Sequence, residues 1–223
     1  MSLVEGLPVE PVIATTFAPS ARRHASASAP SAASGSSAAS SAPGTGCSAD
    51  YLDGDYRLGP AATPDRGIVA RELIGYNRFD GLSPEQFLAD YWDSATGLWN
   101  YPPDNGYLIL DGQPVEFPVT LEPGQPIDRY GSLYGGFLAP FGTSYAARSI
   151  PPSSLDDAPA FTCNYHTYKV AKAFAVEAGP IAPAFGQPGL GLQYQLRSAL
   201  LPGDPGNANV YWLVDHGYLV VTN

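Results

Sequence analysis

The pattern of large apolar and small polar residues divides the chain into a featureless start and a patterned remainder. From residue 25 to residue 42 every position is Ala or Ser, apart from one Pro and one Gly. Because this stretch has no large side chain to bury, it cannot offset the entropy that ordering would cost. We therefore predict that residues 1–46 form a disordered tail or stalk and that folded character begins near Cys47.

Two regular elements are predicted in the part of the chain that follows the tail. Residues 83–92 predict a helix, with Ser83 as N-cap, Pro84 at the first helical position and Gln86 completing a capping box. The apolar side chains of this helix share one face and are Phe87, Leu88, Tyr91 and Trp92. Residues 107–110 predict a strand, and the Asp-Gly pair after them predicts a hairpin turn.

Three apolar segments follow in the C-terminal half. Residues 168–178 carry an apolar stripe at helical spacing that ends at a Gly-Pro pair, and we predict a helix there. Residues 210–214 and residues 218–221 are each apolar enough for a strand. The pattern alone leaves the first of these two open between a strand and a short helix that Gly217 terminates.

The composition favours turns and short elements over a helical bundle. The chain is 44% hydrophobic, so a substantial core is expected, and it contains 24 Gly and 23 Pro. Its formal net charge is −10, with only 11 Lys and Arg residues. An acidic chain repels phosphate backbones, so we expect no nucleic-acid partner. Each Arg is informative in such a chain, because one in a pocket could hold a small anionic ligand.

The cysteines and the start of the chain bear on the cellular compartment. Cys47 and Cys163 could be two free buried thiols or one disulfide, and their number alone does not decide between these. No apolar run approaches the length of a membrane span. The first residues lack the basic start and continuous apolar stretch of a signal peptide, so either a signal was removed or export uses another route.

The common catalytic motifs are missing from the sequence. It contains no P-loop, no dinucleotide-binding glycine motif, no Cys/His metal spacing and no nucleophile-elbow serine. Instead, Gly and Pro frame polar residues in four segments of the C-terminal half, residues 128–140, 148–155, 164–168 and 179–194. The last contains a Gln-Pro-Gly-x-Gly-x-Gln run that Gln193 closes. In this order the four segments resemble the tuberculosis necrotizing toxin domain, a family of NAD glycohydrolases found in bacterial toxins and on fungal cell surfaces.

The resemblance covers roughly residues 121–223 and implies a domain organisation. Residues 56–60 and 101–106 are similar to segments that the fungal members carry before the catalytic domain. We therefore expect residues 47–120 to form an N-terminal extension that packs on the catalytic domain. The implied fold is α+β, a small mixed or antiparallel twisted sheet with flanking short helices and a helical and loop extension. The resemblance also favours a helix and then a strand at the C-terminal end.

The resemblance assigns the central chemistry to three residues. Arg129 and Arg148 match phosphate-contacting arginines, whose guanidinium forks suit diphosphate oxygens. The alternative for either is a structural ion pair with Asp128 or another carboxylate. Gln193 matches the family's catalytic glutamine, which can orient water or a ribose hydroxyl, and its alternative is a loop residue bonded to backbone. We expect Gln193 and Arg148 to act in catalysis and Arg129 in substrate binding.

The remaining candidates are expected to shape the substrate pocket. Phe137 matches an aromatic position of the family's nicotinamide pocket, where a ring could stack on the pyridinium, with core packing as the alternative. His166 matches a site histidine, with a buried structural histidine as the alternative, and Tyr130 is expected to contact substrate. Gly189 and Gly191 would let backbone approach the ligand or adopt a positive φ, with turn geometry as the alternative.

The implied activity is hydrolysis of NAD to nicotinamide and ADP-ribose, with NAD as substrate and no bound cofactor. Nicotinamide leaves as a neutral group from a cationic pyridinium, so the reaction needs no general acid. We expect no metal site, because the sequence shows no cluster of metal ligands. The resemblance also implies no calcium site here, because the acidic calcium-binding tail of some fungal relatives follows the position of Asn223. An ADP-ribosyltransferase and an inactive surface or adhesion module stay open, as do NADP as a substrate and a homodimer. We expect a secreted or cell-surface protein.

Overall fold

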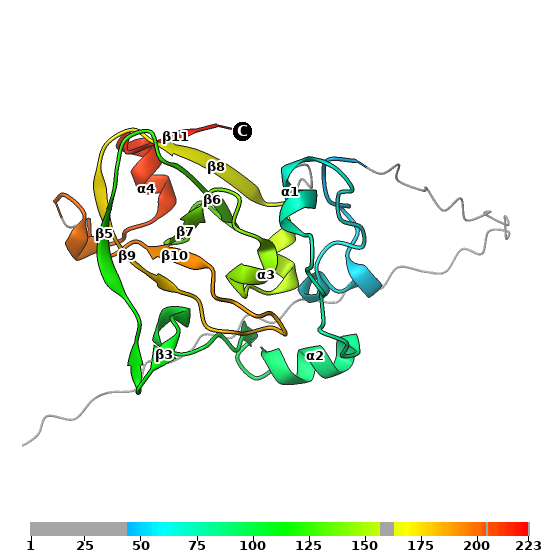
Figure 1. Cartoon of the computed structure of the whole chain (residues 1–223). Coiled ribbons are helices and arrows are strands. Elements are labelled where there is room, and N and C mark those ends of the chain that lie inside the picture. Colours follow the sequence, from blue (N-terminus) through cyan, green and yellow to red (C-terminus); the bar gives the residue numbers. More distant parts are fainter. Residues whose placement is uncertain (1–43, 157–162, 204, 223) are drawn as a thin grey trace, which may run out of the picture. The chain divides into compact units, whose positions relative to one another are not determined.

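A curled antiparallel sheet forms the centre of the computed structural model, which describes residues 44–156, 163–203 and 205–222 (Figure 1). Residues 1–43 of the predicted tail lie outside this range. Within the described residues the sheet contains seven strands: β5 (Phe117–Leu121), β6 (Pro126–Tyr130), β7 (Phe137–Pro140), β8 (Tyr165–Val170), β9 (Phe174–Pro180), β10 (Leu192–Gln195) and β11 (Leu219–Val221). Their spatial order is β11-β8-β6-β7-β10-β9-β5, and every pairing is antiparallel. The predicted α+β class is confirmed.

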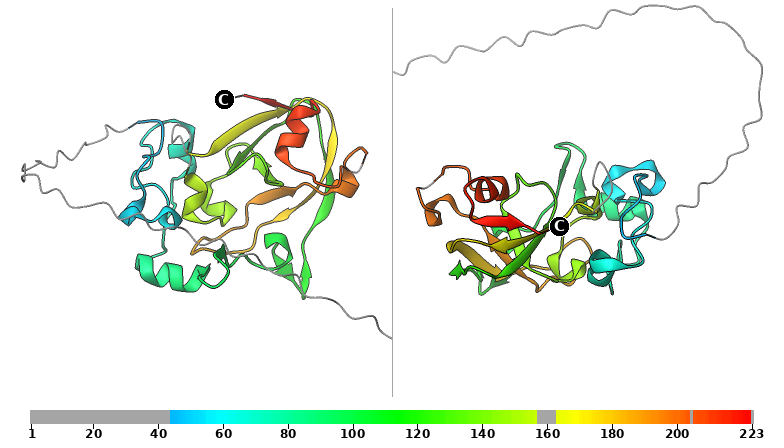
Figure 2. Two further views of the ribbon diagram at one scale, coloured as in Figure 1. Left: turned by 180° about the vertical axis from the view of Figure 1, so that it is seen from behind. Right: turned by 90° about the horizontal axis from the view of Figure 1, so that it is seen from above.

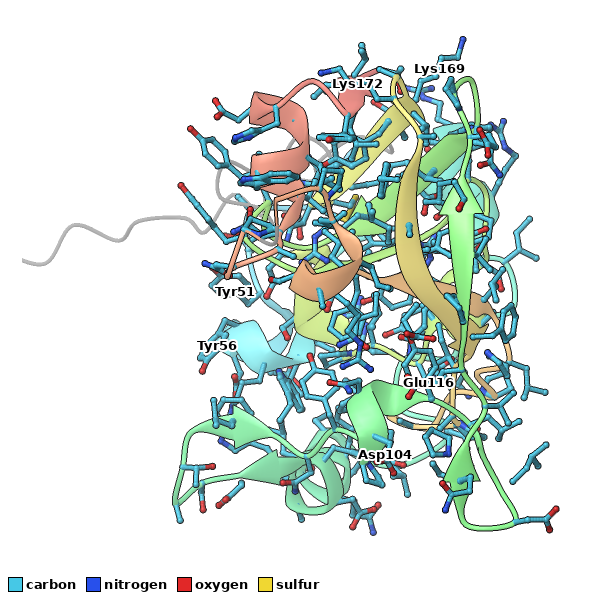
Figure 3. The ribbon with its side chains drawn as sticks, turned by 90° about the vertical axis from the view of Figure 1, so that its left-hand side faces the viewer. Tyr51, Tyr56, Asp104, Glu116, Lys169 and Lys172 are labelled. Carbon is cyan, nitrogen blue, oxygen red and sulfur yellow. A yellow bond between two sulfur atoms is a disulfide. The ribbon has the colours of Figure 1, made fainter. Side chains whose placement is uncertain are left out.

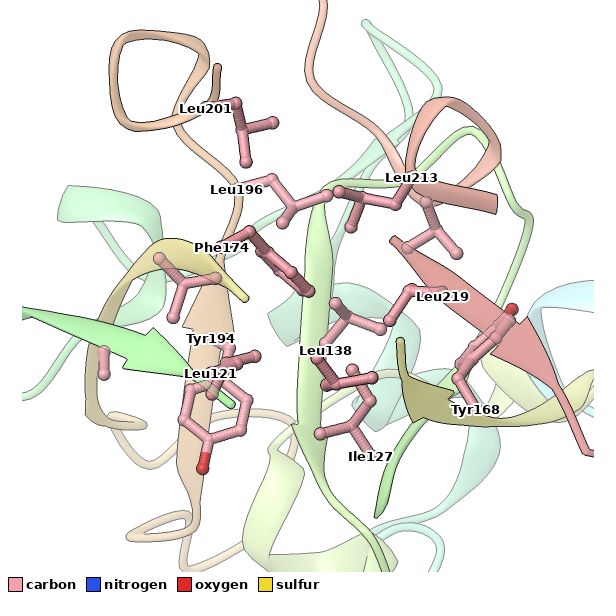
Figure 4. Close-up of a cluster of buried hydrophobic side chains, with 14 residues drawn as sticks. Leu121, Ile127, Leu138, Tyr168, Phe174, Tyr194, Leu196, Leu201, Leu213 and Leu219 are labelled. Carbon is pink, nitrogen blue, oxygen red and sulfur yellow. The ribbon is translucent and has the colours of Figure 1, made fainter. Parts of the chain in front are cut away.

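The main hydrophobic core lies between this sheet and the helix α4 (Val210–Asp215). Figure 4 shows leucine, tyrosine and phenylalanine side chains from several strands converging there. In β9 the side chains of Phe174, Val176 and Ala178 are buried, whereas Ala175 and Glu177 are half-buried. This alternation follows from the two-residue period of a strand. Removal of these apolar surfaces from water is the main force that holds the sheet and α4 together.

The last two elements follow the order that the resemblance favoured. Helix α4 begins after Asn209, whose side-chain oxygen accepts a hydrogen bond from the backbone N–H of Trp212 at 2.8 Å. The helix is followed by Gly217, whose φ of 69° reverses the chain. Strand β11 then pairs with β8. The prediction of a helix and then a strand is therefore confirmed (Figure 2).

The predicted helix over residues 168–178 is wrong. This segment contains the end of β8, a turn at residues 171–173 and most of β9. The turn carries Lys172 and lies at the end of the sheet opposite to Glu116 (Figure 3). β8 lies between β6 and β11, and β9 lies between β5 and β10, so both strands are paired on both sides. These ladders to distant segments outweigh the local helical spacing of the apolar residues.

The N-terminal part contains two short helices and two small strand pairs. They are α1 (Gly67–Glu72), α2 (Pro84–Tyr91), β1 (Trp92–Asp93) with β2 (Leu98–Trp99), and β3 (Ile109–Leu110) with β4 (Gln113–Pro114). Ser83 and Gln86 form the predicted capping box of α2. The β3–β4 hairpin turns at Asp111 and Gly112, whose φ values of 51° and 77° suit a type I′ turn. Both of these local predictions are confirmed.

Several contacts join this extension to the C-terminal half. Cys47 and Cys163 form a disulfide, so of the two alternatives for the cysteines the paired state is the one found. Phe185 packs against rings of the extension. The indole N–H of Trp99 donates to Ser153 Oγ at 3.1 Å. A second buried cluster combines residues of both parts, namely Cys47, Val69, Tyr130, Tyr145, Leu155, Cys163 and Tyr165.

No helix among the described residues is long and apolar enough to cross a membrane.

Short 3₁₀ turns complete the described elements. They are η1 (Leu52–Gly54), η2 (Tyr56–Leu58), η3 (Asp104–Gly106), η4 (Pro152–Leu155) and η5 (Ser198–Leu200). Between β7 and η4 lies α3, a helix of one turn over Tyr145–Arg148. Both η3 and the end of α3 contribute to the cavity described next.

Candidate active site

A cavity of about 600 Å³ brings together residues from four separate parts of the chain. This volume is within the range of roughly 300–1,000 Å³ that is usual for small-molecule sites. The walls come from the extension, from β6 and β7, from α3 and the segment after it, and from the region of β9 and β10. The lining residues are Tyr101, Pro102, Asn105, Gly106, Arg129, Tyr130, Gly131, Phe137, Leu138, Ala139, Arg148, Ser149, Ile150, Ser154, Ile181, Ala182 and Gln193.

Most of the predicted site residues meet at this cavity. The ones that line it are Arg129, Tyr130, Phe137, Arg148 and Gln193. His166 and Gly191 are not among the lining residues. His166 lies opposite Arg129 in the β6–β8 ladder and is half-buried. The fold thus gathers residues that are up to 64 positions apart in the sequence, from 129 to 193.

The glycines of the Gln-Pro-Gly-x-Gly-x-Gln run hold α3 in place. The N–H of Gly191 donates to the carbonyl of Ala147 at 2.9 Å, and a Cβ at Gly191 would lie 2.6 Å from that oxygen. Gly189 has a φ of 65°, and a Cβ there would lie 2.7 Å from the carbonyl oxygen of Ile181. The close approach expected of these glycines is thus made to protein backbone. It seats α3, and Arg148 at its end, against the segment that leads into β10.

Arg129 is held by neutral backbone groups. Its Nε donates to the carbonyl of Ser132 at 2.8 Å, and its Nη1 donates to the carbonyl of Phe137 at 2.6 Å. The guanidinium lies so close to Gly135 that any side chain there would overlap it. Burial lowers the pKa of Arg129. Within the described residues no carboxylate forms an ion pair with Arg129, so its positive charge is not neutralised locally.

Arg148, in contrast, belongs to a buried ionic cluster. Its Nη2 lies 2.7 Å from Asp128 Oδ1 and 3.4 Å from Glu72 Oε2. Its Nε and Nη2 also donate to the carbonyl of Thr143, at 3.0 and 2.8 Å. The guanidinium carbon lies 5.1 Å from the ring centre of Tyr130, a cation–π distance. The ion pair with Asp128 that the sequence left as an alternative is therefore present, in a residue that also lines the cavity.

The carboxylates of this cluster are almost fully enclosed. Glu72 is 3% exposed and Asp128 is 0% exposed. Burial raises the pKa of both carboxyl groups, and the nearby positive charge of Arg148 opposes this rise. Sequence reasoning did not predict Glu72 as a site residue. The available signal was a carboxylate in a short helix next to Val69 and Leu73, whose apolar side chains face inward.

Gln193 is buried in β10 and is tied to the extension. Its Nε2 donates to the backbone carbonyl of Asn105 at 3.1 Å. A carbonyl only accepts, so this contact fixes the nitrogen end of the amide and leaves Oε1 as an acceptor. Asn105 lies in η3 with a φ of 57°, a left-handed conformation that is uncommon outside glycine. Its role was not predicted, although residues 101–106 were noted as similar to the fungal flank.

Phe137 provides the most exposed aromatic surface of the predicted set. It begins β7 and is 38% exposed, although it lines the cavity. Its backbone carbonyl is one of the two that anchor Arg129. Core packing, the alternative for this ring, is therefore not what the fold provides. Among the described residues no three His, Cys, Asp or Glu side chains are grouped so that they could hold a metal ion.

Comparison with known proteins identifies the family. The sequence model of the tuberculosis necrotizing toxin family matches residues 120–221. The chain is 42% identical over 174 residues to the conidial surface nicotinamide adenine dinucleotide glycohydrolase of Aspergillus fumigatus, with 76% of this chain and 70% of the relative covered. Its fold is similar to tuberculosis necrotizing toxin, solved in complex with an immunity factor, at a TM-score of 0.51 and 24% identity over 69% of this chain and 81% of the toxin. The chain belongs to the tuberculosis necrotizing toxin family.

Proposed function

We propose that this chain is an NAD glycohydrolase, which cleaves the bond between nicotinamide and ribose and releases nicotinamide and ADP-ribose. The observation that carries the proposal is the convergence of Arg129, Phe137, Arg148 and Gln193 on one cavity. The proposal is also supported by the relative in Aspergillus fumigatus, which is named as a glycohydrolase of nicotinamide adenine dinucleotide. NAD is the substrate in this proposal, and the reaction uses no further cofactor.

Arg129 is the main ligand of the substrate diphosphate. Its guanidinium is anchored by carbonyls and has no neighbouring carboxylate, so its charge is available to an anion. A guanidinium fork can bind two phosphate oxygens at once. Arg148 lines the same cavity and supplies a second positively charged group. Because Asp128 already neutralises part of its charge, Arg148 contributes less to affinity and more to orientation.

Phe137 receives the nicotinamide ring. Its exposed face lines the cavity beside the carbonyl that holds Arg129, so one element fixes both the diphosphate and the base. A cationic pyridinium is attracted to the face of an aromatic ring. That attraction weakens once nicotinamide leaves as a neutral group, which favours release of the product.

Gln193 acts on the reacting ribose. The barrier to bond cleavage lies in the positive charge that develops on the ribose and in delivery of water to it. The Oε1 of Gln193 accepts a hydrogen bond from the attacking water or a ribose hydroxyl without adding a charge. Asn105 holds the amide in one orientation, so the acceptor is positioned before the reaction begins.

The protein is placed outside the reducing cytosol in this proposal. The Cys47–Cys163 disulfide joins the extension to the turn before β8, and such bonds persist mainly in oxidising compartments. The relative in Aspergillus fumigatus is named as a conidial surface protein. We therefore propose a secreted or cell-surface location.

The test is product analysis by chromatography and mass spectrometry after incubation with NAD, and separately with NADP. From NAD, nicotinamide and free ADP-ribose are expected in equal amounts, whereas hydrolysis of NADP would give nicotinamide and ADP-ribose 2′-phosphate. An added mixture of acceptor proteins distinguishes hydrolysis from transfer, because a transferase would leave ADP-ribose attached to protein. Intact NAD after prolonged incubation with folded protein, or attached ADP-ribose as the main product, would overturn the proposal.

A further inference from the structure

In the buried cluster around Arg148, one hydroxyl group faces two carboxyl groups. The hydroxyl of Tyr165 lies 2.7 Å from Glu72 Oε1 and 2.8 Å from Asp128 Oδ2. A hydroxyl has one hydrogen, so it can donate to only one of these oxygens. Between the Tyr165 oxygen and the other carboxyl group, a hydrogen bond at this distance requires a hydrogen on the carboxyl group. The geometry therefore calls for one additional proton in the cluster.

The neighbours of the two carboxyl groups indicate which of them carries that proton. Asp128 accepts from the backbone N–H of Gly142 at 2.9 Å and lies 2.7 Å from Arg148 Nη2. Both contacts favour its ionised form. Glu72 lies farther from the same nitrogen, at 3.4 Å, and its Oε2 accepts from the hydroxyl of Tyr130 at 2.9 Å. With a proton on Glu72 Oε1, each of the two short contacts of the Tyr165 hydroxyl has one donor and one acceptor.

We propose that Glu72 is a positioning residue of the reaction, which holds a proton and orients Arg148 and Tyr130 from the N-terminal extension. In this state Glu72 donates to Tyr165, which donates to Asp128, which pairs with Arg148. The charges of Asp128 and Arg148 balance, so the cluster next to the cavity is neutral. The inference rests on the proposed function only in its link to NAD, because the proton is argued from contacts within the protein.

Ionisation of Glu72 would change the charge that the substrate meets. A second buried negative charge would leave the cluster at −1 beside a cavity that receives a diphosphate. Electrostatic repulsion at this range weakens anion binding by roughly tenfold or more. Burial raises the pKa of Glu72, which favours its protonated form. The charged and titratable groups facing Glu72 from the neighbouring elements are Asp128 and Tyr130 of β6, Tyr165 of β8 and Arg148 of α3.

Two neutral substitutions separate the hydrogen bonds of protonated Glu72 from its lack of charge. Glu72→Gln is neutral, can donate to Tyr165 and can accept from Tyr130, so it reproduces the protonated state. Glu72→Leu is also neutral and of similar size, but it supplies neither hydrogen bond. Glu116→Gln is a matched control, because Glu116 pairs with Arg197 at 3.0 Å and does not line the cavity.

The first measurement is infrared spectroscopy of the full chain, which requires no turnover. Wild-type protein at neutral pH is expected to show the carbonyl stretch of a protonated carboxyl group, and this band should be missing in Glu72→Gln and kept in Glu116→Gln. The same band in wild type and Glu72→Gln, or no such band in wild type, would overturn the proposal. This result is independent of whether the protein hydrolyses NAD.

The second measurement is the affinity for ADP-ribose by calorimetry, together with KM and kcat for NAD, as a function of pH. Glu72→Gln is expected to stay within about threefold of wild type, and Glu72→Leu to raise KM by roughly tenfold with a folded thermal transition. In wild type, KM should rise over the pH range in which the infrared band disappears, and in Glu72→Gln it should not. A Glu72→Leu protein with wild-type KM, or a Glu72→Gln protein as weak as Glu72→Leu, would contradict the positioning role. Failure of wild type to bind ADP-ribose would count against the proposed function instead.

Discussion

The side-chain amide of Gln193 donates to the backbone carbonyl of Asn105, 3.1 Å away, across a sequence separation of 88 residues. This bond joins the C-terminal strand β10 to the turn η3 of the extension. It makes the orientation of the proposed catalytic amide depend on a segment that lies outside the family match of residues 120–221.

Replacement of Gln193 tests the proposed chemistry directly. Gln193→Ala should lower kcat by roughly a hundredfold or more, since loss of a positioned hydrogen-bonding group costs about 2.7–4 kcal/mol at the transition state. KM should change little, because the phosphates and nicotinamide keep their own contacts. Steady-state kinetics would measure both, with the exposed Gln113→Ala as control. Full turnover by a folded Gln193→Ala protein would mean that another group positions the water.

Replacement of Arg129 tests substrate binding. Arg129→Ala should raise KM by roughly ten- to a hundredfold, the equivalent of charge-assisted hydrogen bonds of about 1.5–3 kcal/mol. Gly135→Ala should raise KM as well, because its methyl group would overlap the guanidinium and displace it while the charge remains. The exposed Arg71→Ala should behave as wild type. An unchanged KM in both Arg129→Ala and Gly135→Ala would remove Arg129 from the proposed diphosphate site.

Arg148 should behave differently, because its guanidinium is part of the core as well as of the cavity. Arg148→Ala leaves the fully buried Asp128 without its 2.7 Å partner. Breaking a buried pair in this way costs about 3–5 kcal/mol, so we expect a clearly lower Tm together with loss of activity. Thermal unfolding of Arg148→Ala beside Arg129→Ala would show the contrast. A native Tm for Arg148→Ala would mean that the ion pair contributes little to the fold.

The disulfide should make a large contribution to the free energy of unfolding. Cys47 and Cys163 are separated by 116 residues, and closure of a loop of that size stabilises by roughly 4–5 kcal/mol in the chain-entropy account. The double variant Cys47→Ala with Cys163→Ala should therefore unfold at lower urea concentration. Reductant should destabilise the wild type and leave the double variant unchanged. An equal response of both proteins to reductant would argue against the bond.

Deletion of residues 1–43 should leave Tm and kcat unchanged, because residues 25–42 are Ala or Ser apart from one Pro and one Gly and offer no large side chain to the core. Deletion of residues 1–119 should abolish activity, since Glu72 and Asn105 contact Arg148 and Gln193 from within that part. Circular dichroism and turnover of the two truncated proteins would measure the difference. An active protein consisting only of residues 120–223 would show that the extension is dispensable.

Features that depend on neighbouring residues could be predicted from the sequence. The capping box of α2 uses Ser83 and Gln86, three positions apart, and the β3–β4 turn uses the adjacent Asp111 and Gly112. Local sterics and hydrogen bonds decide such elements, whatever surrounds them. The family resemblance added the residues that meet at the cavity, because their motifs are also short.

Features that depend on distant partners were decided only by the tertiary structure. Residues 168–178 carry a helical spacing of apolar side chains, yet ladders to β5, β6, β10 and β11 make them strands. Glu72 is 76 positions from Arg148, and no local pattern links the two. Hydrogen bonds and charges act over a few ångströms in space, whereas the sequence records only order along the chain. The fold therefore determines which carboxylate faces Arg148 and which carbonyl holds Gln193.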